Sequence, residues 1–114
     1  MRESGILMPV SSLPGPYGIG CFGKAAFQFV DFLSAAGQTI WQLLPLSPTG
    51  YGDSPYQSCS AFAGNPYFVD LEALEKEGLL TAADFKAESW GKDPLEVDYG
   101  TLYVSRFAVL RKAY

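Results

Sequence analysis

The fold class is decided by residues 22–46, which read FGKAAFQFVDFLSAAGQTIWQLLPL. In the first half, apolar side chains recur at helical spacing and form one stripe, made of Phe22, Ala25, Ala26, Phe29, Val30, Leu33 and Ala36. Gly37 follows the stripe and predicts the end of that helix. Residues 39–46 then form an apolar run of the length of a β-strand.

Upstream, residues 5–10 (GILMPV) are a second short apolar run and predict another strand. Strand, helix and strand within about 40 residues are typical of a βαβ unit, so the two strands should be parallel. Because both runs are almost continuously apolar, we expect them to be buried on both faces, as strands of parallel sheets are.

Downstream, residues 47–66 form a long loop with almost no charge, and residues 67–69 could add a short extended piece. Three polar residues are expected to cap the later elements: Asp70 for a helix over 71–77, Thr81 for a turn through residue 85, and Asp98 for a last helix. One side of that last helix carries Tyr99, Leu102, Tyr103, Phe107, Leu110 and Tyr114.

Two parallel strands do not make a stable sheet, and a parallel sheet needs helices on both faces or closure into a barrel. A (β/α)₈ barrel takes about 250 residues. The sequence therefore predicts an α/β chain in which residues 1–114 are the N-terminal portion of a (β/α)₈ TIM barrel. This incomplete domain holds the first βαβ unit, a long rim loop and the following helices.

The composition argues against several classes of partner and site. The net charge is −4, from 8 basic and 12 acidic residues, and Lys and Arg do not cluster, which argues against nucleic acid and anionic membranes as partners. Two cysteines without any histidine predict neither a disulfide framework nor a zinc site. No apolar run has the length of a signal peptide core or a membrane span, so we expect a cytoplasmic protein. We also expect no cofactor and no metal.

The two loops that follow the strands, residues 11–20 and 47–66, should lie on one rim, where parallel α/β proteins build their sites. Both loops are rich in Gly, Pro, Ser and Tyr, which suits a neutral ligand with many hydroxyl groups. A Tyr ring can stack on a sugar while nearby hydroxyls and amides hydrogen-bond it. For any single Tyr in these loops, a purely structural role is the commoner alternative.

Residues 18–23 spell G-x-G-x-x-G between a strand and a helix, a pattern found in dinucleotide-binding folds. Such folds also carry an acidic residue about 20 residues further on. No Asp or Glu lies between Asp31 and Asp53. The sequence therefore disfavours nucleotide binding.

Glycoside chemistry requires two carboxylates. The two rim loops contain one acid, Asp53, and its position between Gly52 and Ser54-Pro55 is also typical of a turn or a backbone cap. We therefore expect no catalytic residue within residues 1–114 and no activity from this chain alone.

Four motifs carry a family resemblance: residues 11–20 (SSLPGPYGIG), 41–46 (WQLLPL), 48–58 (PTGYGDSPYQS) and 60–67 (SAFAGNPY). They resemble the 4-α-glucanotransferases of glycoside hydrolase family 77, the amylomaltases or disproportionating enzymes, and the similarity resumes at residues 97–103 (VDYGTLY). The resemblance implies a barrel with inserted subdomains, in a chain several times longer than this one. It implies retaining transfer of an α-1,4-glucan segment, through a covalent glycosyl-enzyme, to the 4-hydroxyl of glucose or another glucan.

The resemblance also implies site residues. Tyr56 matches the Tyr that stacks on the sugar at the cleavage point, and Ser54 and Asp53 flank it as substrate-binding residues. Tyr51 and Tyr103 match aromatic positions that form a second glucan site away from the catalytic centre in some members. The implied partners are maltooligosaccharides, starch or glycogen. The family's Asp nucleophile and Glu acid/base occur later in its sequence and match no position here.

Two alternatives stay open at this stage. An α-glucan hydrolase on a related barrel is disfavoured by loop 48–66, and a free-standing carbohydrate-binding module by the unfinished βαβ pattern. The sequence leaves open why the chain is short, which acceptor and chain length the protein prefers, and its oligomeric state.

Overall fold

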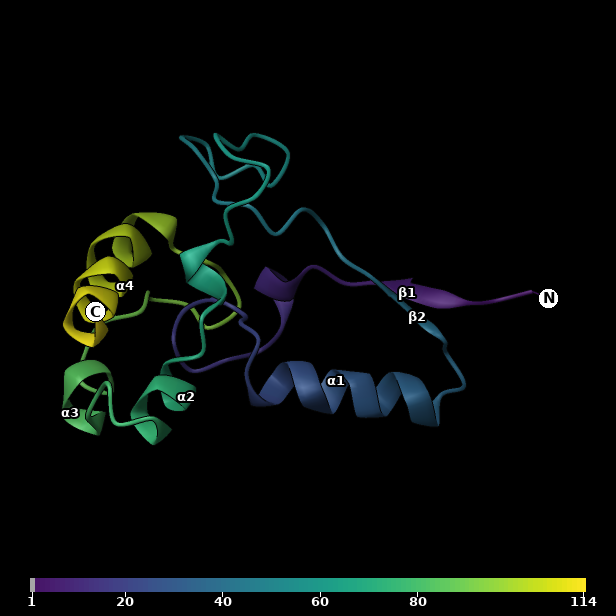
Figure 1. Cartoon of the computed structure of the whole chain (residues 1–114), viewed down its shortest axis with the longest axis horizontal. Coiled ribbons are helices and arrows are strands. Elements are labelled where there is room, and N and C mark those ends of the chain that lie inside the picture. The colour runs from purple at the N-terminus through teal and green to yellow at the C-terminus, as the bar shows by residue number, and fades with distance from the viewer. Residues whose placement is uncertain (1) are drawn as a thin grey trace.

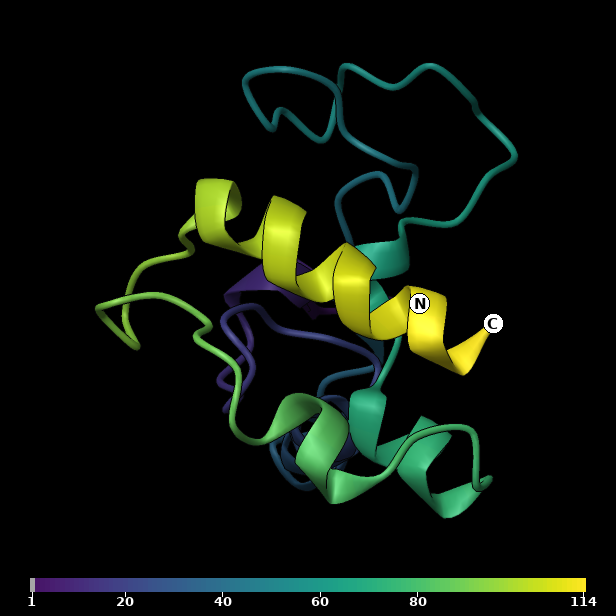
Figure 2. The ribbon, with the colours of Figure 1, turned by 90° about the vertical axis from the view of Figure 1, so that its left-hand side faces the viewer.

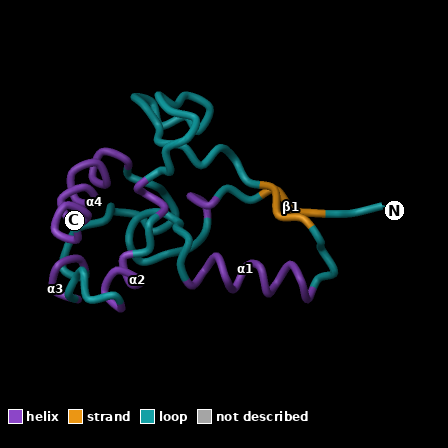
Figure 3. Tube along the Cα trace, in the orientation of Figure 1, coloured by secondary structure: helices purple, strands orange, loops and turns teal. Residues whose placement is uncertain are grey.

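The computed structural model describes residues 2–114, and a strand–helix–strand unit forms its first part. Strand β1 (Gly5–Leu7) leads through a long loop to helix α1 (Lys24–Ala35), and strand β2 (Ile40–Gln42) follows. The two strands pair in parallel, with Gly5 opposite Ile40, which confirms the predicted βαβ arrangement. Helix α1 runs alongside the strand pair (Figures 1 and 3).

Local sequence accounts for the bounds of α1. Gly37 has a φ of 71°, a left-handed conformation that glycine adopts without steric cost, and the Gln38 N–H donates to the Leu33 carbonyl at 2.9 Å. Ala26 and Leu33 are buried, and the Phe29 ring packs edge-on against Trp41 with 5.1 Å between centroids. The predicted helix is confirmed, and its stripe lies partly against the strands.

The strands differ from the prediction in length and in burial. Each has three residues, and the side chains of Ile6 and Ile40 are exposed. Pro9 has no N–H to donate to a ladder, and the chain turns there into a short 3₁₀ helix, η1 (Val10–Ser12). Burial on both faces was therefore a wrong expectation for this chain, because α1 covers one side of a sheet of only two strands.

The second half contains the 3₁₀ helix η2 (Pro66–Phe68) and helices α2 (Leu71–Lys76), α3 (Ala82–Phe85) and α4 (Tyr99–Ala113). The predicted caps are confirmed. The Asp70 side chain accepts from the Glu72 N–H at 3.2 Å, Thr81 forms a capping box with Asp84, and the Asp98 side chain accepts from the Thr101 N–H at 3.0 Å.

Residues 67–69 were expected to be extended, but Tyr67 and Phe68 belong to η2. Two local features favour the 3₁₀ turn. Pro66 is pre-set for the first helical position, and the Asn65 side chain accepts the Tyr67 N–H at 3.0 Å.

Helix α4 lies across the molecule with loop 47–64 on one side of it and α2 and α3 on the other (Figure 2). Its fully buried residues are Leu102, Arg106 and Val109, whereas Tyr103 and Tyr114 are exposed. The prediction of an apolar side on this helix is therefore only partly correct. The core-facing side of α4 includes a charged residue, which an apolar stripe does not anticipate.

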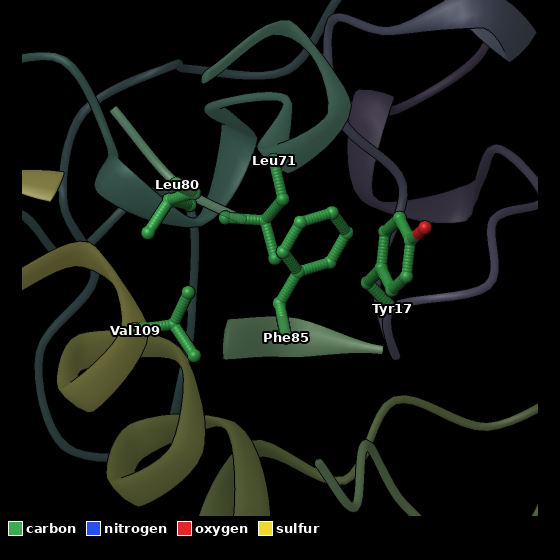
Figure 4. Close-up of a cluster of buried hydrophobic side chains, with 5 residues drawn as sticks. All are labelled: Tyr17, Leu71, Leu80, Phe85 and Val109. Atoms are coloured by element: carbon green, nitrogen blue, oxygen red, sulfur yellow. The ribbon is translucent and has the colours of Figure 1, made fainter. Parts of the chain in front are cut away.

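A cluster of buried side chains joins the loop after β1 to the three C-terminal helices: Tyr17, Leu71, Leu80, Phe85 and Val109 (Figure 4). The Tyr17 ring meets the Phe85 ring edge-on at 5.2 Å, and its hydroxyl donates to the Glu72 carboxylate at 2.9 Å. Loop 11–20 is thereby packed against the helices through Tyr17.

Candidate functional site

A cavity of about 750 Å³ lies between the long loop 47–66 and α4. Loop residues form one side, and residues of α4 form the other. Its aromatic lining consists of Tyr51, Tyr67, Tyr99, Tyr103 and Phe107. A concave surface rich in aromatic rings is typical of a ligand site, and here it bridges two segments that are far apart in the chain.

The aromatic rings of α4 and η2 form a continuous wall. The Tyr67 ring lies 6.0 Å from Tyr99 and 5.5 Å from Phe107, and Phe107 lies 5.6 Å from Tyr103, all between centroids. Tyr67 is buried within this wall. At its outer end Tyr103 is 69% exposed, and Tyr51 on the loop is 103% exposed. These two rings therefore have free faces on which a sugar can stack.

Polar residues line the same cavity, among them Asp53 and Asn65. Burial raises the pKa of the Tyr67 hydroxyl and that of the Tyr99 hydroxyl, and the negative charge of Asp53 raises both further. Both phenols therefore stay protonated at neutral pH and can donate hydrogen bonds. The lining suits a neutral, hydroxyl-rich ligand better than an anion.

Asp53 both forms part of a turn in the loop and lines cavities. The Gly50 N–H donates to the Gln57 carbonyl at 3.2 Å, and the Asp53 N–H donates to the Gly50 carbonyl at 3.1 Å, so the loop closes on itself. Asp53 has a φ of 56°, which fits the turn role that its sequence context indicates. It also lines both the large cavity and a smaller one toward the strand ends, beside Ser11 and Leu46.

The other two substrate-binding candidates lie outside the large cavity. The Tyr56 side chain is 74% exposed, and the Ser54 hydroxyl accepts the Tyr56 N–H at 3.3 Å, which shapes the backbone of this turn. The structure thus brings Tyr51, Tyr103 and Asp53 together in the lining of one cavity, which does not include Ser54 and Tyr56.

The glycines of residues 18–23 serve the chain's own packing. A Cβ on Gly18 would collide with the Trp90 carbonyl, and one on Gly20 would collide with the Val10 carbonyl. At Gly23 the Asp70 carboxyl carbon is 2.8 Å from the Cβ position, so a negative charge faces the start of α1. This environment disfavours a phosphate group, in agreement with the sequence-based argument against nucleotide binding.

Sequence reasoning missed Asn65, Tyr67 and Arg106. The first two belong to the motif SAFAGNPY, which could have pointed to them. Arg106 is fully buried, and its guanidinium donates to the backbone carbonyls of Tyr67, at 2.9 Å, and Val69. Burial lowers the pKa of Arg106. No sequence pattern signals it, because a lone arginine on a helix is usually exposed.

Within residues 2–114, none of the helices combines the length and the apolarity that crossing a membrane requires.

Known proteins match almost the whole chain. A family model described as 4-alpha-glucanotransferase matches residues 8–114. A 4-alpha-glucanotransferase of Streptococcus pneumoniae is 56% identical over 112 residues, which are 98% of this chain and 22% of the relative. One of Thermus thermophilus is 50% identical over 113 residues, which are 99% of this chain and 22% of the relative.

A solved structure agrees with these relatives. Amylomaltase from Streptococcus agalactiae, in complex with acarbose, superposes with a TM-score of 0.96 at 50% identity. The match covers 99% of this chain and 23% of the amylomaltase chain. The chain therefore spans slightly more than a fifth of the length of the relatives it matches.

Proposed function

This chain belongs to the 4-alpha-glucanotransferase family, glycoside hydrolase family 77, and from that membership we propose that it is part of a longer enzyme that transfers α-1,4-glucan segments. The match over residues 8–114 carries this proposal, because it includes every motif on which the sequence resemblance depends. The acceptor is the 4-hydroxyl of glucose or another glucan, and the substrates are maltooligosaccharides, starch or glycogen.

The proposed architecture is a (β/α)₈ barrel to which this chain contributes the first βαβ unit and a rim. The parallel pairing of β1 and β2, with α1 alongside, is the repeating unit of such barrels. The exposed flanks of both strands leave places for neighbouring strands. Residues 47–66 then lie at the carboxyl end of β2, which is the face where barrel enzymes bind substrate.

In the proposed enzyme, Tyr56 stacks on the sugar at the cleavage point. Its exposed ring is available for that contact, and the hydrogen bond from its N–H to Ser54 fixes the turn that presents it. Stacking that improves as the sugar flattens toward an oxocarbenium ion would stabilise the transition state more than the bound substrate. Asp53 would accept hydrogen bonds from sugar hydroxyls.

We assign the large cavity to the second glucan site. Tyr51 on the loop and Tyr103 on α4 supply two exposed rings, and the hydroxyls of the lining residues Tyr67 and Tyr99 would supply hydrogen-bond donors. A glucan segment offers apolar ring faces and hydroxyl edges that match this pattern. The site would hold a part of a long chain that extends beyond the cleavage point.

The chemistry itself needs a nucleophile and an acid/base, and the rim loops of this chain contain a single acid, Asp53. We therefore assign no catalytic residue among the 114 and expect the isolated chain to be inactive. Its contribution to a retaining double displacement is to hold the glucan.

Product analysis of the full-length protein tests the proposal. Incubation with maltotriose should give glucose together with maltopentaose and longer glucans on chromatography. A hydrolase would give only shorter products, and that outcome would contradict transfer. The 114-residue chain, incubated in parallel at the same molar concentration, should leave maltotriose unchanged.

A further inference from the structure

Arg106 is a charged residue in the interior of this chain. It lies on α4 between the apolar residues Leu102 and Val109, and its exposed fraction is 0%. Its guanidinium donates to three backbone carbonyls, those of Tyr67 and Val69 and, at 3.5 Å, that of Tyr17. These hydrogen bonds join α4 to η2 and to the loop after β1.

The surroundings of Arg106 do not offset its charge fully. The ion pairs found in residues 2–114 are Lys86–Glu75 and Lys112–Asp84, and Arg106 belongs to neither. Its Nε atom is buried without a partner, and its guanidinium lies 5.8 Å from the Trp90 ring centroid. Burying a guanidinium that donates to neutral carbonyls is costly, and the nearby Asp70 carboxylate and Cys21 thiol offset only a part of that cost. An apolar side chain of similar volume could fill this space. A positional role explains why an arginine occupies it.

The acceptors of Arg106 define what it positions. The carbonyls of Tyr67 and Val69 belong to the end of η2, so both hydrogen bonds fix the direction of that backbone. The Tyr67 ring contacts Phe107, and Phe107 contacts Tyr103, so Tyr67 supports the outer ring of the cavity. The hydrogen bond from Arg106 and the aromatic wall thus meet at Tyr67, the first at its carbonyl and the second at its ring.

We propose that Arg106 is a positioning residue for the large cavity: by fixing the Tyr67 backbone against α4, it holds the aromatic wall that ends at Tyr103. This inference rests on the proposed function, in which that cavity binds a segment of a long glucan. Arg106 itself touches no sugar. Its loss should weaken the binding of long glucans and leave the reaction of short ones unchanged.

The test compares long and short substrates in the full-length enzyme. Arg106→Met removes the hydrogen-bond donors and keeps an apolar contact with Trp90, whereas Arg106→Lys keeps the positive charge. Arg111→Met is the control, because it makes the same change at an exposed position of the same helix. Arg106→Met should raise KM for amylose about fivefold, the size of one displaced aromatic contact, with kcat on maltotriose unchanged. Arg106→Lys should give an intermediate KM, and Arg111→Met the wild-type value.

A double-mutant cycle with Tyr103→Ala separates positioning from general destabilisation. If Arg106 acts through the wall, the double variant should have the amylose KM of Tyr103→Ala alone, because the two changes affect one contact. Multiplied effects, or an unchanged KM in Arg106→Met, would overturn the inference. Equal losses of kcat on both substrates with a lower Tm would show a merely structural role and overturn it as well.

The remaining outcomes distinguish this inference from the proposed function. Absence of transfer in the wild-type enzyme would refute the proposed function. An amylose KM unaffected by Tyr103→Ala would refute the second glucan site, and the inference with it. If Arg106→Met does not fold, Arg106→Lys decides: a KM above that of Arg111→Met supports positioning, and an equal KM overturns it.

Discussion

Neighbouring residues of one loop differ sharply in their surroundings. Tyr51 and Asp53 line the large cavity, whereas Tyr56 lies outside it and is 74% exposed, although one hydrogen bond between Gly50 and Gln57 closes the whole turn. Tyr56 is therefore not a core residue of this chain. Its ring is free for the stacking role that the family resemblance implies.

Tyr56→Ala in the full-length enzyme should lower kcat/KM for maltotriose transfer about tenfold or more, because the ring is proposed to stabilise the flattened sugar. Because the side chain is 74% exposed within residues 2–114 and belongs to none of the buried clusters there, the free energy of unfolding should change by less than about 0.5 kcal/mol. Steady-state kinetics and urea unfolding measure the two effects. Tyr56→Phe, which keeps the ring, should retain most of the activity, and an unchanged kcat/KM in Tyr56→Ala would refute the platform role.

The two cysteines should differ in reactivity. Cys59 is exposed, whereas burial and then the Asp70 carboxylate raise the pKa of the Cys21 thiol. Because the thiolate is the nucleophile and Cys21 is also less exposed, Cys21 should react with iodoacetamide more slowly than Cys59 at pH 8. Peptide mapping by mass spectrometry at several pH values measures both rates. Faster labelling of Cys21 would contradict its placement between α1 and Asp70.

At the scale of secondary-structure elements, single polar residues determine where three of the helices begin. Asp70, Thr81 and Asp98 were predicted as caps from the sequence, and each forms its cap in the structure. These predictions succeed because a cap depends on residues within three or four positions. The ends of the strands were harder to predict. The apolar runs extend to Val10 and Leu46, whereas the paired strands end at Leu7 and Gln42.

The Asp98 cap should make stability depend on pH. Hydrogen bonds from the Thr101 N–H and hydroxyl, at 3.0 and 2.7 Å, lower the pKa of Asp98 in the folded state. The unfolded state therefore binds the proton more readily. The contribution of this cap is present above the ordinary Asp pKa of about 4 and is lost as pH falls through the lowered value.

Asp98→Asn keeps a capping side chain and removes the titration. Urea unfolding of the full-length protein between pH 5 and pH 2.5 should show a shallower loss of stability on acidification than in wild type. Asp31→Asn, which removes an exposed carboxylate from α1, controls for the change in net charge. Identical pH profiles for wild type and Asp98→Asn would refute the contribution of this cap.

At the scale of the whole molecule, apolar surface remains uncovered. The chain extends over 48 × 30 × 28 Å, with the strand pair and α1 at one end and α2 to α4 at the other. Large apolar side chains are exposed on β1, β2, α1 and the long loop, including Ile6, Ile40, Phe27, Phe32 and Phe62. Many exposed apolar side chains together with unpaired strand edges favour association.

We expect the isolated 114-residue chain to self-associate or to be loosely packed. Size-exclusion chromatography should give high-mass or broad peaks, and the dye ANS should bind with enhanced fluorescence. Replacing Phe27 and Phe32 by Lys should reduce the high-mass fraction, since both rings lie on the exposed side of α1. A sharp monomer peak, no ANS binding and cooperative melting would instead favour the independently folded binding module.

The sequence alone determined the family, through motifs such as PTGYGDSPYQS, and the elements whose signals are local, namely α1 with its stop at Gly37 and the three capped helices. Tertiary structure alone decided the burial of Arg106 and the gathering of Asp53, Tyr67 and Tyr99 in one cavity. The reason is physical. A cap or a helix stripe is specified by residues a few positions apart, whereas the charge on Arg106 finds its carbonyls only after α4, η2 and the loop after β1 have packed together.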